Sequence, residues 1–166
     1  MSFLDQMNDA TKSLQEKRKE QLQDIVRYAN SNYDNGKYGL LKCAKDASYK
    51  IINGKKVATY RVPVSTPVWW DGASFIEPQP FKVQMTYGTF FKRTTDYPID
   101  HWRFVPNEKY REEYELYIKT IKNLARQDGI EVEEIVSNHY SEYGVGEDVG
   151  TSPSRFEHYI RYTMRF

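Results

Sequence analysis

The side chains best suited to acid–base chemistry lie close to one proline. Asp96, Asp100 and His101 surround Tyr97-Pro98, and a carboxylate beside an imidazole can take up and release protons near neutral pH. The same residues also form an ordinary polar turn, which is the more frequent outcome for such short clusters. A hydrolase-like enzyme centred on these residues is therefore our third hypothesis. We expect a non-enzymatic protein and assign no catalytic residue.

Metal and nucleotide chemistry lack their usual motifs. The histidines stand apart at positions 101, 139 and 158, without the His-x-Glu or His-Glu-x-x-His spacing that places ligands on one face. The single cysteine, Cys43, excludes a disulfide within the chain and a cysteine-based zinc cluster. The glycines of residues 144–150 follow no phosphate-binding pattern. We expect no metal, no cofactor, a Cys43 that is a small buried apolar side chain in a strand, and a His158 that belongs to the core.

The end of the chain carries a basic face. Residues 155–166 alternate as a strand, and one side presents Arg155, Tyr159, Arg161 and Arg165. Guanidinium groups beside an aromatic ring can bind phosphates and stack on bases. The alternative is a solvated strand face whose arginines pair with acidic neighbours, and the formal net charge of +1 lacks the basic surplus typical of nucleic-acid binders. Binding of a nucleic acid or nucleotide through these four residues is our second hypothesis.

Aromatic residues concentrate in the middle of the chain. They form 15% of the sequence, with 14 tyrosines, and residues 66–104 are both aromatic and interrupted by prolines. Trp, Tyr and Arg dominate the energetics of protein interfaces. We therefore predict a partner-binding surface made of five aromatic residues: Trp69, Trp70, Tyr87, Phe91 and Trp102. The alternative is that these rings complete the core and cover a sheet edge.

A long helix is predicted at the N-terminus. Ser2 and Asp5 have the spacing of a capping box, and apolar residues recur at helical spacing in residues 3–14 and again in residues 22–33. The Asp34-Asn35-Gly36 sequence predicts the end of this helix. Two arrangements remain open for residues 1–20. They fold back onto their own core, or they project and bury their apolar stripe against another chain, forming a homo-oligomer through this helix.

Four strands are predicted next. They cover residues 37–44, 47–52 and 56–64, followed by the alternating run 81–87. Asn53-Gly54 is a strong hairpin signal. A three-residue loop over residues 53–55 pairs Tyr49 and Ile51 with Thr59 and Val57, and this register matches the apolar faces better than a two-residue loop.

The second half of the chain is predicted to be mainly helical before its last strand. Asn107 begins a helix that Gly129 ends, and residues 130–143 fit a second helix better than a strand because alternation fails at Ile135-Val136. A helix-turn-helix is disfavoured here, since its second helix would present glutamates to DNA. The strand 155–166 follows.

These elements predict an α+β fold with a largely antiparallel sheet of about five strands, a long N-terminal helix and a helical hairpin before the last strand. The length of 166 residues predicts a single domain over residues 1–166. No signal-peptide pattern or membrane-length apolar run is found, so we expect a cytoplasmic protein without a membrane partner. Our leading hypothesis is a non-enzymatic binding or regulatory protein that acts on a protein partner, of the small accessory type found in bacteria and phages.

Overall fold

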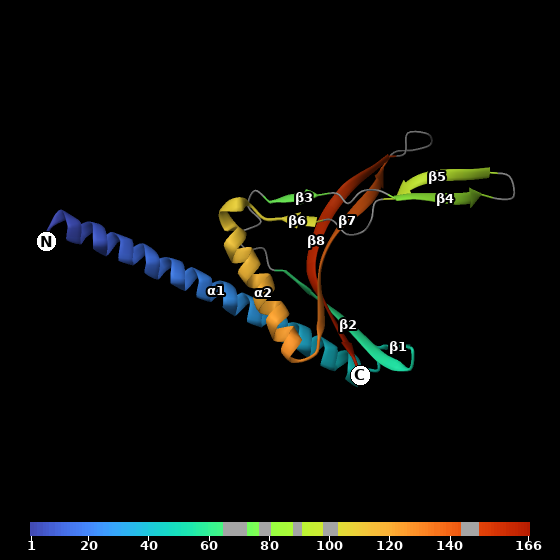
Figure 1. Cartoon of the computed structure of the whole chain (residues 1–166). Coiled ribbons are helices and arrows are strands. Elements are labelled where there is room, and N and C mark those ends of the chain that lie inside the picture. The colour runs from blue at the N-terminus through green and yellow to red at the C-terminus, as the bar shows by residue number, and fades with distance from the viewer. Residues whose placement is uncertain (65–72, 77–80, 88–90, 98–102, 144–149) are drawn as a thin grey trace.

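The computed structural model describes residues 1–64, 73–76, 81–87, 91–97, 103–143 and 150–166. Its first element is the helix α1 (Phe3–Lys45), which runs for 43 residues. The predicted capping box is confirmed, since the Ser2 hydroxyl accepts from the amide of Asp5 at 3.2 Å and the Asp5 carboxylate accepts from the amide of Ser2 at 2.8 Å. Figure 1 shows the N-terminal half of α1 extending away from the rest of the molecule.

The predicted end of this helix at Asp34-Asn35-Gly36 is wrong, and so is the predicted strand over residues 37–44. α1 continues through both. Its buried residues include Tyr33, Gly36 and Leu40, which keep the three- and four-residue spacing of one helical face. The helix continues because this face packs against the sheet, and that tertiary packing overrides the low helix propensity of glycine.

The main sheet is antiparallel and has four strands in the order β1-β2-β8-β7. Their bounds are β1 (Lys50–Ile52), β2 (Lys55–Pro63), β7 (Glu131–Tyr143) and β8 (Gly150–Arg165). β1, β2 and β8 correspond to the predicted strands 47–52, 56–64 and 155–166 with shifted bounds. β8 lies centrally, pairing Tyr162 with Tyr60 of β2 and with Val132 of β7. The predicted α+β class, the long N-terminal helix and the antiparallel sheet are confirmed.

The hairpin between β1 and β2 has a two-residue loop. Ile52 pairs with Lys55, and Asn53 and Gly54 between them have φ values of 51° and 77°. Two consecutive positive φ angles match the right-handed twist of the flanking strands, which is why such short loops favour Asn-Gly. The predicted three-residue loop is therefore wrong, and Val57 lies opposite Lys50.

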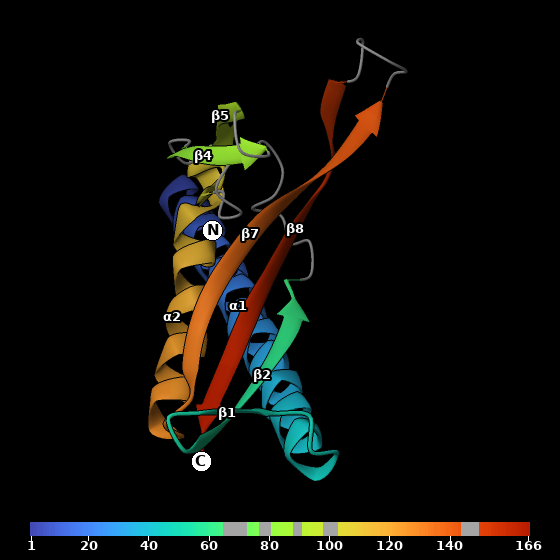
Figure 2. The same ribbon diagram turned by 90° about the vertical axis from the view of Figure 1, so that its right-hand side faces the viewer.

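The predicted second helix over residues 130–143 is wrong, and with it the helical hairpin. This segment is β7, and it forms a long β-hairpin with β8 whose register shifts once, between His139 and Tyr140. Figure 2 shows the two strands side by side along the helices. Ile135 and Val136 are each 2% exposed. Successive strand residues point to opposite faces, so β7 is covered on both faces at this point, which explains why the alternation fails.

The remaining elements are short strand pairs and a second helix. β3 (Ser74–Ile76) pairs with β6 (Arg103–Val105), and β4 (Phe81–Tyr87), the predicted strand 81–87, pairs with β5 (Phe91–Tyr97). A 3-10 turn, η2 (Glu108–Tyr110), leads into α2 (Arg111–Gln127). The predicted helix is confirmed as α2, but Asn107 caps η2 instead, where its side chain accepts from the amide of Lys109, and α2 begins at Arg111. Gly129 follows the helix with a φ of 66°.

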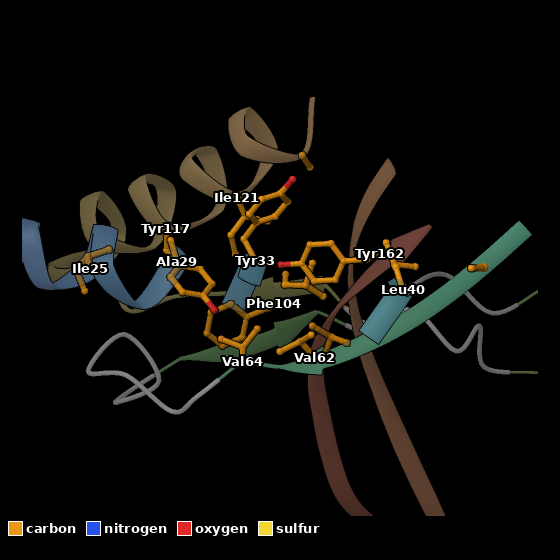
Figure 3. Packing of buried hydrophobic residues seen from close by; sticks show 14 residues of the cluster. Ile25, Ala29, Tyr33, Leu40, Val62, Val64, Phe104, Tyr117, Ile121 and Tyr162 are labelled. Atoms are coloured by element: carbon orange, nitrogen blue, oxygen red, sulfur yellow. The ribbon is translucent and has the colours of Figure 1, made fainter. Parts of the chain in front are cut away.

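The core lies between the two helices and one face of the main sheet. Ala29 of α1, Ile121 of α2 and Tyr162 of β8 are almost completely buried there, with Phe104 packed beside them (Figure 3). No helix among the described residues has the length and apolar character needed to cross a membrane. The core involves only the second half of α1, because residues 1–17 are all exposed.

Candidate functional site

An apolar stripe lies exposed on the N-terminal half of α1. Phe3, Leu4, Met7 and Leu14 are 76%, 65%, 53% and 67% exposed, and we call these four residues the N-terminal stripe. Phe3, Leu14 and the core residue Ile25 follow one another at intervals of 11 residues. Eleven residues complete about three helical turns, so the three side chains lie on the same face of α1. The stripe therefore continues the face of α1 that packs in the core, beyond the point where the core ends.

Arg18 fixes the place where α1 leaves the body of the molecule. Its guanidinium donates to Glu112 at 2.5 Å and to Oε1 of Glu113, both on α2. Glu113 is 1% exposed, and its Oε2 is buried without a hydrogen-bond partner among the described residues. The two carboxylates raise the pKa of Arg18 above its ordinary value. The pairing binds α1 to the first turn of α2 and leaves residues 1–17 beyond it.

A groove adjoins the stripe where α1 meets α2. It has a volume of about 520 Å³, and Leu22, Val26 and Leu116 give it an apolar floor. Arg18 and Gln15 lie at its edge on the side of the free helix. The groove and the N-terminal stripe are thus neighbouring surfaces along α1. Residues of α1 alone form the stripe, whereas residues of both α1 and α2 form the groove.

The most chemically suggestive cluster of the described residues is a trio in the core. Nε2 of His158 lies 3.1 Å from Oε2 of Glu134, and the Tyr114 hydroxyl donates to the same carboxylate at 2.5 Å. Burial, followed by the charge of Glu134, raises the pKa of Tyr114. The ring of Phe104 packs on His158 at 4.7 Å between centroids.

The trio lies within the core. Glu134 also lines a cavity of about 10 Å³ between α2 and the sheet. Tyr114 comes from α2, Glu134 from β7 and His158 from β8. The contacts therefore join three elements, and the prediction that His158 is a core histidine is confirmed by its burial. Sequence reasoning missed its partners because three distant segments supply them.

A second polar link joins the two helices near their other ends. The Tyr33 hydroxyl and the Lys37 ammonium, at 3.4 Å, both donate to Asp128. The hydrogen bond from Tyr33 is the main cause that lowers the pKa of Asp128, and Lys37 adds to it. Another apolar groove, of about 350 Å³, lies beside this link between Leu40 and Met164.

The predicted aromatic surface falls largely outside the described residues. Trp69, Trp70 and Trp102 all lie there. Tyr87 and Phe91 are cross-strand partners where β4 and β5 meet their connection, so the structure brings these two together at one end of a hairpin. The surface itself stays a prediction.

The residues of the predicted basic face lie on β8, and two of the arginines pair with glutamates of β7. Arg161 pairs with Glu133, and Arg165 pairs with Glu131 at 3.2 Å. Tyr159 lies beneath the guanidinium of Arg61 at 5.0 Å, while Arg155 is placed only by its backbone register with His139. Sequence reasoning missed the glutamate partners because residues 130–143 were expected to be helical. Their alternation, Glu131 and then Glu133, was the available signal.

Three of the remaining predicted residues, Asp96, Asp100 and His101, belong to the hypothesis of an enzyme, which stays a prediction. Asp96 pairs with Lys82 in the register of β4 and β5, whereas Asp100 and His101 lie outside the described residues. Cys43 is half-buried and lies on α1 rather than on a strand. Among the described residues, no group of three or more His, Cys, Asp or Glu side chains is placed to hold a metal ion.

No protein-family model, curated protein or solved structure matches this chain. Its function is therefore inferred from its own surfaces and contacts.

Proposed function

We propose that this chain is a non-enzymatic binding or regulatory protein that acts on a protein partner, and that the N-terminal stripe is its contact surface. The observation that supports this proposal is the exposure of four large apolar side chains on a helix that extends beyond its own core. An exposed apolar stripe of this kind is characteristic of an interaction site. We further propose that it works in the cytoplasm, as an accessory protein of a bacterium or phage.

Helix packing gives the stripe a defined mode of recognition. Phe3, Met7 and Leu14 repeat at spacings of four and seven residues, which places them on one side of the helix. An apolar stripe of this spacing binds by lying in a complementary apolar groove. Each of these side chains contributes roughly 1.5–3 kcal/mol when fully buried, before the costs of association. The stripe can therefore supply the affinity of a specific contact.

The test replaces stripe residues with a polar residue of good helix propensity. The double variant Phe3→Gln/Leu14→Gln is expected to keep the circular dichroism spectrum of the folded protein and lose capture of the partner from a host extract. The matched control is Tyr38→Gln, since Tyr38 is 70% exposed on the same helix but lies outside the stripe. Equal capture by the wild type and the double variant would contradict the proposal.

The aromatic residues predicted from the sequence form a separate candidate surface for the same function. Alanine at Trp69, Trp70 and Trp102 is expected to weaken capture while the protein stays folded. Capture that survives all three substitutions would remove this surface and leave the stripe as the contact.

Nucleic-acid binding is the second candidate function. It is supported by the arginines on the outer face of β8, and it ranks second because Arg161 and Arg165 already pair with glutamates. The variant Glu131→Gln/Glu133→Gln releases both arginines, so it should raise the affinity for single-stranded RNA if this face binds phosphates. Failure of wild type and variant alike to retain RNA at low salt would exclude this function.

A further inference from the structure

We propose that the partner of the N-terminal stripe is a second copy of this chain, whose own α1 packs antiparallel on it across a two-fold axis between Ala10 and Thr11. This inference rests on the proposed function and names the partner. In a two-fold pair the same patch is used on both chains, so each stripe covers the other and no apolar surface of the stripe is left to recruit a third chain.

The positions of Met7 and Leu14 of the stripe determine the register, because each faces the other across this axis. Phe3 and Leu4 lie about seven residues before Ala10 and Thr11, and Arg18, at the edge of the 520 Å³ groove, lies seven residues after Thr11. Seven residues span about 10 Å of helix. An antiparallel pair centred on this point therefore places Phe3 of each helix opposite Arg18 of the other, at the near edge of the groove.

The packing along the axis fits close helix contact. Met7 of one copy lies opposite Leu14 of the other, and the small side chains of Ala10 and Thr11 lie at the centre. Small residues at a crossing let two helices approach to the 8–10 Å between axes that packed helices adopt.

Charge selects the antiparallel direction. Residues 3–10 contain Asp5 and Asp9 and no basic residue, whereas residues 11–19 contain Lys12, Lys17 and Lys19 besides Arg18 and only one acidic residue. A parallel pair would set the basic segments side by side, and an antiparallel pair sets basic beside acidic. Asp5 and Asp9 point away from the stripe, so this effect selects direction without direct ion pairs. The opposed helix dipoles act in the same sense.

Disulfide mapping distinguishes the two directions. Met7→Cys and Leu14→Cys are each made in a Cys43→Ser background, and one of the two proteins carries a tag. Both positions are exposed, so both variants are expected to fold. Mild oxidation of the mixture should yield mainly the tagged–untagged species, because position 7 faces position 14. Position 7 alone should crosslink poorly, since two copies of it lie about 10 Å apart along the axis, beyond the usual reach of a disulfide.

Light scattering of the wild type at rising concentration gives the assembly state. A dimer that Met7→Gln/Leu14→Gln converts to monomer, while Tyr38→Gln leaves it intact, would support self-pairing. A wild type that stays monomeric, or crosslinks that join position 7 to position 7, would overturn it. If the wild type is monomeric but its stripe variants lose capture of another protein, the proposal of self-pairing is wrong and the proposed function stands. Stripe variants that change neither assembly nor capture overturn the proposed function as well.

Discussion

Gly36 of α1 lies directly against the ring of Tyr162, the central tyrosine of β8. A Cβ atom at position 36 would come within 2.5 Å of the Cδ2 atom of that ring. The ring cannot easily move aside, because Tyr162 is completely buried and its hydroxyl donates to Oδ1 of Asn32 at 2.6 Å. The glycine is therefore required by the distance between helix and sheet, and its φ is that of an ordinary helical residue.

The first prediction concerns Gly36→Ala. In an exposed helix this change would stabilise the protein by about 1 kcal/mol. Adding atoms to a packed core instead costs about 1–3 kcal/mol. We expect a cost at the upper end of that range, because the Tyr162 ring is close and fixed in place. We expect a net loss of about 2 kcal/mol in the free energy of unfolding, measured by urea denaturation. The control Asn35→Ala, on the exposed side of the same turn, should be neutral or slightly stabilising. Equal stability of Gly36→Ala and wild type would refute the steric argument.

The same pair shows what the sequence could and could not predict about the fold. Gly36 follows Asp34-Asn35, and this local sequence is typical of a helix end. The counter-signal was the spacing of Tyr33, Gly36 and Leu40, which is helical. Choosing between them requires the position of Tyr162, 126 residues away in the sequence. Strongly periodic segments such as α2 and β8 were predictable because local pattern and tertiary packing agree there.

The candidate site, too, could be predicted from the sequence only in part. The apolar spacing of Phe3, Met7 and Leu14 is visible in the sequence, and so is the choice between folding back and projecting. The outcome depends on Arg18, whose partner Glu113 lies 95 positions away. Nothing local marks Glu113 as buried, since a glutamate in the first turn of a helix is usually solvated. The stripe was predictable, and the point where α1 separates from the body was not.

The second prediction concerns that ion pair. Arg18→Met leaves the buried carboxylate of Glu113 without its cation, whereas Glu113→Leu leaves Arg18 with Glu112 and water. Removing one partner of a fully buried pair costs about 3–5 kcal/mol. Arg18 is 37% exposed, so we expect a smaller loss of about 1–3 kcal/mol for Arg18→Met. Glu113→Leu should cost less.

A double-mutant cycle of these two changes provides the check. Arg18→Met/Glu113→Leu should be about as stable as Glu113→Leu alone, because the uncompensated charge is then absent. Additive losses in the double variant would show that the two residues act independently.

The third prediction concerns acid stability. Asp128 has a lowered pKa because it accepts from Tyr33 and lies near Lys37. A carboxylate whose folded pKa lies below the ordinary value of 3.8 contributes stability that is present above pH 3.8 and lost as the pH falls through the folded pKa. Asp128→Asn should therefore be less stable than wild type at neutral pH, and the difference should shrink in acid. Urea midpoints between about pH 2 and 5 test this.

A suitable control is Asp9→Asn, which removes a carboxylate from the exposed half of α1. A difference between wild type and Asp128→Asn that stays constant with pH would exclude the role given to this carboxylate. Added salt should also reduce the contribution, because Asp128 and Lys37 are both about half exposed.

The fourth prediction concerns alkaline pH and rests on four tyrosines. Burial is the main cause that raises the pKa of Tyr33, Tyr114, Tyr117 and Tyr162 above the ordinary value of 10.0. In the unfolded chain these phenols ionise at their ordinary pKa, so their contribution to stability is present below pH 10.0 and is lost as the pH rises toward the folded pKa values. We expect part of the tyrosinate absorbance to appear only together with the loss of helical circular dichroism.

Tyr162→Phe connects this behaviour to the core. The variant removes one phenol from the late step of the titration and also the hydroxyl that donates to Asn32. Leaving the buried Asn32 acceptor without that donor should cost about 1–3 kcal/mol, so unfolding should begin at lower pH with a smaller coupled absorbance change. Complete formation of tyrosinate while the helical signal persists would contradict the burial of these four side chains as the cause.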